Sequence, residues 1–289
     1  MSTTLLTANS EISTTVGSYW HPSFKVALSV PGTWEDLPTL RRSEIPFDGE
    51  DYQQLSSLVG TTGVRNLYIP NPSRFNGEVL TPDQFVTDAV ETFCHAGGTA
   101  CLWGRNRLAD GCLLPNKESG GMFRASGCPM IVAGLGDKLA YAHGGLDCLI
   151  DQGYIKSNRI RGRRWPSVID SLLFALGAKT PKERQAVHVW VFYSIRPEDF
   201  FHATDHREHG AQNLRLKDYL DACGYTCYRQ DGARLHFNLP QLIREQALSR
   251  GVLDTGIHIC DEDNVFLPES YPTTRRGSGS YMITVVRLS

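Results

Sequence analysis

Residues 128–145 read CPMIVAGLGDKLAYAHGG and contain the hairpin on which the predicted fold depends. Two short apolar runs, Cys128–Ala133 and Lys138–Ala142, flank the glycine-rich segment 134–137. A turn segment of this kind between two apolar runs is typical of a β-hairpin. The stretch therefore predicts two paired strands in the middle of the chain.

The register of this hairpin predicts that two reactive side chains meet. With Leu135 and Gly136 as the central turn residues, Cys128 lies directly across the hairpin from His143. Directly opposed residues share a sheet face, with Cβ atoms about 4.5–5.5 Å apart. An imidazole beside a thiol stabilises the nucleophilic thiolate, which indicates thiol chemistry. The alternative is that Cys128 is a small buried hydrophobe and His143 a hydrogen-bonded histidine at a strand end.

Outside the hairpin, helical and strand patterns alternate irregularly along the chain. Capping and stop signals predict helices at 82–96, 166–177, 213–223 and 239–250. Apolar runs predict strands at Thr99–Trp103, Val187–Tyr193, Ile257–Cys260 and Tyr281–Leu288. Without a regular βαβ rhythm, this order favours an α+β fold with a mixed β-sandwich core and flanking helices. We expect residues 1–20 to form a flexible N-terminal arm and residues 21–289 a single α+β domain.

Composition excludes several classes of protein. The 289 residues carry 29 Lys+Arg against 31 Asp+Glu, and a net charge of -2 gives no general attraction to nucleic acid or to an anionic membrane. No apolar stretch approaches the roughly 18–20 residues of a membrane span, and no signal peptide is recognisable, so we expect a cytoplasmic protein. Eight cysteines without C-x-x-C spacing predict neither a zinc ribbon nor a disulfide framework.

The residues around Cys128 and His143 resemble two known protein families that share a fold. Ser126-Gly127-Cys128, followed by His143-Gly144-Gly145, resembles the catalytic core of the cytotoxic necrotising factor type of glutamine deamidases. The resemblance implies that Cys128 and His143 hydrolyse the side-chain amide of a protein substrate. In this hydrolysis, Cys128 attacks the carboxamide, His143 transfers the proton, and ammonia leaves.

The same segment, with Ala109-Asp110-Gly111 upstream, is also similar to the laccase-domain (polyphenol oxidoreductase-type) proteins. This second resemblance continues through Leu239–Arg250, Cys260 and Arg275-Arg276-Gly277, and it covers roughly residues 95–288. It implies a zinc ion held by His, Cys and His, and phosphorolysis or deamination of a purine nucleoside.

Departures from the laccase-domain pattern concern the metal and the substrate. The strand-based match to the first zinc-binding histidine is Trp103, which cannot bind metal, and the alternative ligand His95 lies in a predicted helix. Under the zinc hypothesis the ligands are His95, Cys128 and His143. Without His95 only two ligands remain, and zinc would be held poorly. On the substrate side, His143-Gly-Gly-Leu-Asp-Cys148 replaces His-Ala-Gly-Trp-Arg-Gly, and Val191-Phe192-Tyr193 replaces Ile-Gly-Pro.

Three other features have both a functional and a structural interpretation. The basic run at 156–165 is either an anion contact or an exposed loop. His202, His206 and His209 form either a zinc cluster or part of a polar loop or short helix. Arg275-Arg276 either reaches a substrate anion or ends a sheet.

Three functions follow from these observations. The first is a cysteine hydrolase acting on amide nitrogen through Cys128 and His143, with no cofactor. The second is a zinc-dependent purine nucleoside phosphorylase or adenosine deaminase of the laccase-domain type. The third is a catalytically inactive binding module with the same fold. Metal content separates the first function from the second.

Overall fold

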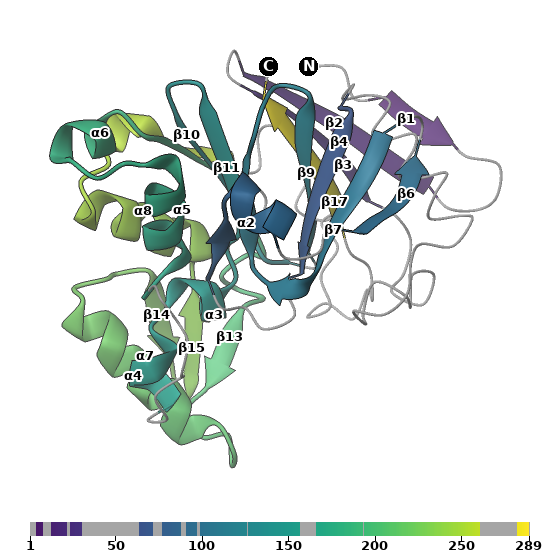
Figure 1. Ribbon diagram of the computed structural model, residues 1–289. Coiled ribbons are helices and arrows are strands. Elements are labelled where there is room, and N and C mark those ends of the chain that lie inside the picture. Colours follow the sequence, from purple (N-terminus) through teal and green to yellow (C-terminus); the bar gives the residue numbers. More distant parts are fainter. Residues whose placement is uncertain are drawn as a thin grey trace.

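A computed structural model places two β-sheets against each other, with helices on the outer face of the smaller one (Figure 1). The structure describes residues 4–7, 13–21, 24–30, 64–71, 77–87, 91–96, 99–125, 127–156, 166–192, 194–260 and 282–288. The two sheets and their helices confirm the predicted α+β class.

The larger sheet has eight strands in the order β1-β2-β3-β17-β9-β4-β7-β6. Their bounds are β1 Thr4–Thr7, β2 Ser13–His21, β3 Phe24–Val30, β4 Asn66–Asn71, β6 Glu91–Ala96, β7 Thr99–Leu108, β9 Ser119–Ala125 and β17 Met282–Leu288. Strand β17, from the C-terminal end of the chain, pairs with β3 on one side and β9 on the other. Within the predicted N-terminal arm, the structure places β1 and β2, where Thr14, Thr15 and Val16 are β-branched residues that favour strands.

The smaller sheet has six strands in the order β16-β12-β10-β11-β8-β5. Their bounds are β5 Val79–Leu80, β8 Gly111–Leu114, β10 Met130–Leu135, β11 Lys138–His143, β12 His188–Phe192 and β16 Ile257–Cys260. Helix α5 (Val168–Leu176) packs on β10 and β11, and α8 (Leu239–Ser249) packs on β12, β16 and α5. The strands predicted at β12 and β16 and the helices predicted at α5 and α8 are confirmed.

A small layer lies beyond one end of the six-stranded sheet (Figure 1). It combines a three-stranded sheet of β13 (Phe201–Ala203), β14 (Tyr228–Asp231) and β15 (Arg234–Phe237) with α7 (Gly210–Ala222) and α4 (Gln152–Lys156). The remaining short elements are α2 Pro82–Thr87, α3 Leu146–Leu149, α6 Pro181–Gln185 and the 3-10 turn Asp254–Gly256.

The helix predicted at 82–96 is wrong in its second half. Helix α2 ends at Thr87, and Glu91–Ala96 forms the edge strand β6, which pairs antiparallel with β7. Backbone pairing along β7 outweighs the local helical spacing, because strand formation depends on neighbours that are distant in sequence. His95 therefore lies on a strand, opposite Ala100.

Tyr141 connects the two sheets. Its side chain is fully buried, and its hydroxyl donates to the backbone carbonyl oxygen of Tyr68 on β4 at 2.8 Å. The same hydroxyl lies 3.3 Å from the carbonyl oxygen of Met122 on β9. The ring fits because β9 has glycine at position 121, where a Cβ atom would lie 1.9 Å from Tyr141 Cε1. The close packing of the two sheets thus requires a residue without a side chain at this point.

Several predicted features lie outside the described residues, among them 157–165 of the basic run and Arg275-Arg276. Within the described part of the chain, no helix is long and apolar enough to cross a lipid bilayer.

Replacing Gly121 with Ala should destabilise the protein by about 3 kcal/mol or more, because the new methyl group overlaps the buried Tyr141 ring. The control is Gly136→Ala, where φ is +60° and no atom lies within 4 Å of the added Cβ, so the expected cost is about 1 kcal/mol. Urea denaturation of both variants measures the difference. Equal losses would contradict this account of the sheet interface.

Candidate functional site

His143 is the last residue of β11 and the centre of the candidate site. Its strand lies between β10 and β8 in the six-stranded sheet, and its side chain is 8% exposed. Its backbone N–H donates to the carbonyl oxygen of Asp110 at 2.8 Å. The imidazole is therefore fixed within the sheet core.

The predicted hairpin is confirmed, but its register is wrong by two residues. Gly136 and Asp137 are the central turn residues, and His143 pairs with Met130 instead of Cys128. Gly136 adopts φ +60°, which glycine tolerates and which a tight hairpin turn requires. A shift of two residues leaves each side chain on the same face of the sheet, because side chains alternate with a period of two.

Cys128 therefore lies just before β10. Continued by two residues, the register of the hairpin places Cys128 opposite Gly145. The N–H of Gly144 donates to the carbonyl oxygen of Pro129 at 2.8 Å, which extends the hairpin pairing by one step. A Cβ atom on Gly145 would lie 2.8 Å from His143 Nε2 and 3.3 Å from Cys128 Sγ. The thiol and the imidazole therefore both pack against Gly145, where a side chain would overlap the ring. Cys128 is partly exposed, whereas His143 is buried.

Asp110 faces the other ring nitrogen of His143. Asp110 lies in the short connection from β7 to β8, and its side chain is fully buried. Its Oδ1 atom is 3.5 Å from His143 Nδ1. Oδ2 accepts a hydrogen bond from the backbone N–H of Gly77 at 2.5 Å. Within the described residues Oδ1 accepts no hydrogen bond. The residue after Asp110, Gly111, must be glycine, because a Cβ atom there would lie 2.0 Å from the Tyr141 carbonyl oxygen.

Cys148 completes the surroundings of His143. It lies on the four-residue helix α3, which begins directly after Gly145, and its Sγ is 3.3 Å from His143 Nδ1. The side chain is fully buried, and this burial raises the pKa of its thiol to about 12. Sequence analysis did not place Asp110 or Cys148 in the site. The only signals were that Asp110 belongs to a quoted motif and that Cys148 stands where the resembling family has glycine.

The charge of His143 follows from these neighbours. Burial by itself lowers the pKa of an imidazole, but the adjacent Cys148 and Cys128 sulfurs and the Asp110 carboxylate all favour the protonated ring. Their combined effect raises the pKa of His143 well above its ordinary value.

Asp110, His143 and Cys148 have the chemistry and the spacing of a metal site. Their ligand atoms lie within 4.8 Å of one another, and no other group of three such residues occurs in the described part of the chain. Ligands of a tetrahedral zinc ion, with bonds of about 2.0–2.3 Å, lie roughly 3.3–3.7 Å apart. The measured separations from His143 Nδ1 are 3.3 Å to sulfur and 3.5 Å to oxygen. A nitrogen, a thiolate and a carboxylate oxygen that accepts no hydrogen bond fit zinc.

Other predicted ligands have different outcomes. His95 and Trp103 both lie in the eight-stranded sheet, on β6 and β7, and the role of His95 as a ligand remains a prediction. His206 Nδ1 accepts hydrogen bonds from the N–H groups of Glu208 and His209 just before α7. His202 contacts Asn213 Oδ1 at 3.3 Å. Among the described residues the three histidines form no group of metal ligands, and they do not share one loop, because His202 lies on β13 and His209 directly precedes α7.

With the fold and the site defined, comparison with known proteins identifies the fold. Neither a scan against protein-family models nor a search of curated proteins finds a match. Solved structures do match. The Neisseria meningitidis protein NMB0706, described under the family model DUF152, has a TM-score of 0.61 at 13% identity, over 95% of this chain and 99% of that chain.

Two further structures agree over nearly the same length. YlmD from Geobacillus stearothermophilus has a TM-score of 0.58 at 12% identity, covering 98% of each chain. The Bacillus licheniformis hypothetical protein YfiH has a TM-score of 0.53 at 12% identity, covering 93% of this chain and 97% of that chain. The chain therefore shares the fold of these three solved structures. These comparisons do not test the resemblance to the cytotoxic necrotising factor deamidases.

Gly145→Ala should disrupt the site while leaving the fold intact. The backbone of Gly145 has φ −66°, which any residue adopts, so the effect is steric. The new methyl group would lie 2.5 Å from His143 Cε1 and should displace the ring from Asp110 and Cys148. We expect a changed imidazole NMR signal for His143 and a stability loss of about 1–3 kcal/mol. An unchanged signal, as expected for Gly136→Ala, would contradict the described geometry.

Proposed function

We propose that the protein is a metal-dependent enzyme of the laccase-domain type that acts on a purine nucleoside. The observation that carries this proposal is the buried Asp110, His143 and Cys148 donor set beside the accessible Cys128. The sequence motifs that resemble laccase-domain proteins, and the fold of the DUF152 group that belongs with them, support it. The donors Asp110 and Cys148 also compensate for the histidine ligand that Trp103 replaces.

Each residue has a distinct role in this proposal. Asp110, His143 and Cys148 would hold the metal, which when bound acts as a Lewis acid. Cys128 is partly exposed beside the imidazole and would contact the substrate. Gly145 has no side chain, so the ring and the Cys128 thiol can both lie against it, and a proton on the ring could reach a leaving group bound next to Cys128.

The nucleoside need not be bound in the way the resembling family binds it. Leu146 and Asp147 stand where that family has Trp and Arg, and Leu146 is buried. The loop after β12 is tied to the site, because the N–H of Ile195 donates to the carbonyl oxygen of Gly127 at 2.7 Å. We therefore place the residues that select the substrate on this loop and on α3.

A second candidate, favoured by a specific observation, is a cysteine hydrolase acting on amide nitrogen. The His143 imidazole lies between the Cys128 thiol on one side and the Asp110 carboxylate on the other. This is the order in which a nucleophile, a base and an orienting acid act in thiol hydrolases. Cys128 would attack a side-chain carboxamide, ammonia would leave, and water would hydrolyse the thioester.

Activity assays with matched variants separate the candidates. The zinc-loaded protein should release a free base from inosine with phosphate, or ammonia from adenosine. Asp110→Asn and Cys148→Ser should each reduce this turnover by about 100-fold or more, as should a chelator.

Three other results would contradict the proposal. Release of ammonia from a glutamine-containing peptide that resists chelator and Cys148→Ser but is lost in Cys128→Ser would establish the cysteine hydrolase. Turnover of nucleoside that survives Asp110→Asn would exclude the proposed donor set. No turnover of either substrate would favour the inactive binding module.

A further inference from the structure

The position of Cys148 depends on a helix that cannot stabilise itself. Helix α3 has four residues, and its N-cap Gly145 offers no side chain to bind the free N–H groups. Helices this short are not stable alone in water, because nucleation is costly and few hydrogen bonds compensate for it. Contacts from elsewhere in the chain must therefore hold Cys148 against His143 Nδ1.

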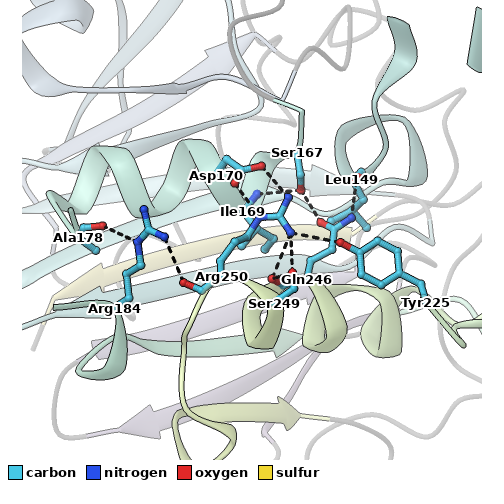
Figure 2. A network of polar contacts seen from close by, with 10 residues as sticks. All are labelled: Leu149, Ser167, Ile169, Asp170, Ala178, Arg184, Tyr225, Gln246, Ser249 and Arg250. Atoms are coloured by element: carbon cyan, nitrogen blue, oxygen red, sulfur yellow. Dashed lines mark hydrogen bonds and ion pairs between the residues drawn. The ribbon is translucent and has the colours of Figure 1, made fainter. Parts of the chain in front are cut away.

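Gln246 on α8 supplies one such contact, 97 residues away in sequence. Its Nε2 donates to the carbonyl oxygen of Leu149, the residue after Cys148 and the last of α3, at 2.5 Å (Figure 2). Carbonyl groups in the last turn of a helix have no partner within the helix. Gln246 therefore satisfies a backbone group that α3 leaves free.

The orientation of the Gln246 amide is fixed from its other side. The hydroxyl of Ser167 donates to Gln246 Oε1 and accepts from the backbone N–H of Ile169, as the N-cap of α5. Because the Leu149 carbonyl can only accept, the amide nitrogen must face α3. A continuous chain of contacts runs from the start of α5 through Gln246 to α3, and Cys148 links it to His143.

Docking of α8 against α5 does not require Gln246. Arg250 forms a two-pronged ion pair with Asp170 of α5, with Nε and Nη2 at 2.7 and 2.9 Å from its two oxygens (Figure 2). The apolar side chains of Leu242, Ile243 and Ala247 are also fully buried on α8. A buried amide is costly unless its hydrogen bonds are made, so an apolar residue would pack here with less risk. Among the described residues, Gln246 makes the side-chain hydrogen bond that joins α8 to α3.

We propose that Gln246 is a positioning residue that sets Cys148 Sγ against His143 Nδ1. Its amide fixes the C-terminal end of α3, and without that link the helix end and its thiol shift away from the imidazole. This inference concerns the site of the proposed function, but its test does not depend on nucleoside turnover.

The test compares Gln246→Met on α8 with Arg250→Met at its C-cap, two variants that each remove the polar contacts of one side chain and keep a long side chain. Two properties are measured: alkylation of Cys148 by iodoacetamide in the folded metal-free protein, followed by peptide mass spectrometry, and zinc affinity by competition with a chromogenic chelator. Gln246→Met should accelerate Cys148 alkylation and weaken zinc binding by about tenfold or more, the usual effect of losing an outer-shell contact. Arg250→Met should lower the urea midpoint but leave both properties near those of the wild type.

Equal effects of the two variants on Cys148, at equal stability, would overturn the inference. If Gln246→Met does not fold, Ser167→Ala, which frees one side of the amide, should change both properties in the same direction but by less. No change in Ser167→Ala would overturn the inference as well. If the wild-type protein binds no zinc, the proposed function fails, and the alkylation rates alone decide the role of Gln246.

Discussion

The structure of the site depends on one constraint, the burial of the Asp110 carboxylate directly against the His143 imidazole. A buried carboxylate is costly unless it is paired and hydrogen-bonded, and Asp110 meets this requirement through His143 and the N–H of Gly77. The two residues can approach because their backbones are also bonded to each other. The glycine at 111 is a consequence of the same close approach of β8 to β11.

This constraint gives the two sides of His143 different chemistry. The Nδ1 side is closed and holds Asp110 and Cys148, whereas the Nε2 side packs against Gly145 near the partly exposed Cys128. A metal held on the closed side and a substrate bound next to Cys128 would both act on one ring. The cysteine hydrolase uses the same geometry with Asp110 as an orienting group. The decisive difference between the two functions is therefore whether the closed side binds a metal.

Local patterns in the sequence predict the helices α5 and α8, the strand β12 and the central hairpin, because each is bounded by capping or turn residues. The predicted hairpin register is wrong because it places the turn at Leu135-Gly136, whereas the structure turns at Gly136-Asp137, where Gly136 has a positive φ. The helix over 82–96 failed where pairing with β7 outweighed local spacing. Asp110 and Cys148 are not predicted by the local patterns around His143. Asp110 lies opposite His143 only because β8, from a distant part of the sequence, pairs with β11. Cys148 contacts the imidazole only because α3 folds back against the end of β11.

The most direct test of the account is the spectrum of the protein loaded with cobalt(II) in place of zinc, in the wild type and in two cysteine variants. A cobalt ion bound by a thiolate shows a sulfur-to-metal charge-transfer band. We predict one metal ion per chain, with a band that is lost in Cys148→Ser and retained in Cys128→Ser. A band that is lost in Cys128→Ser but retained in Cys148→Ser, or a protein that binds no metal, would contradict the proposed site.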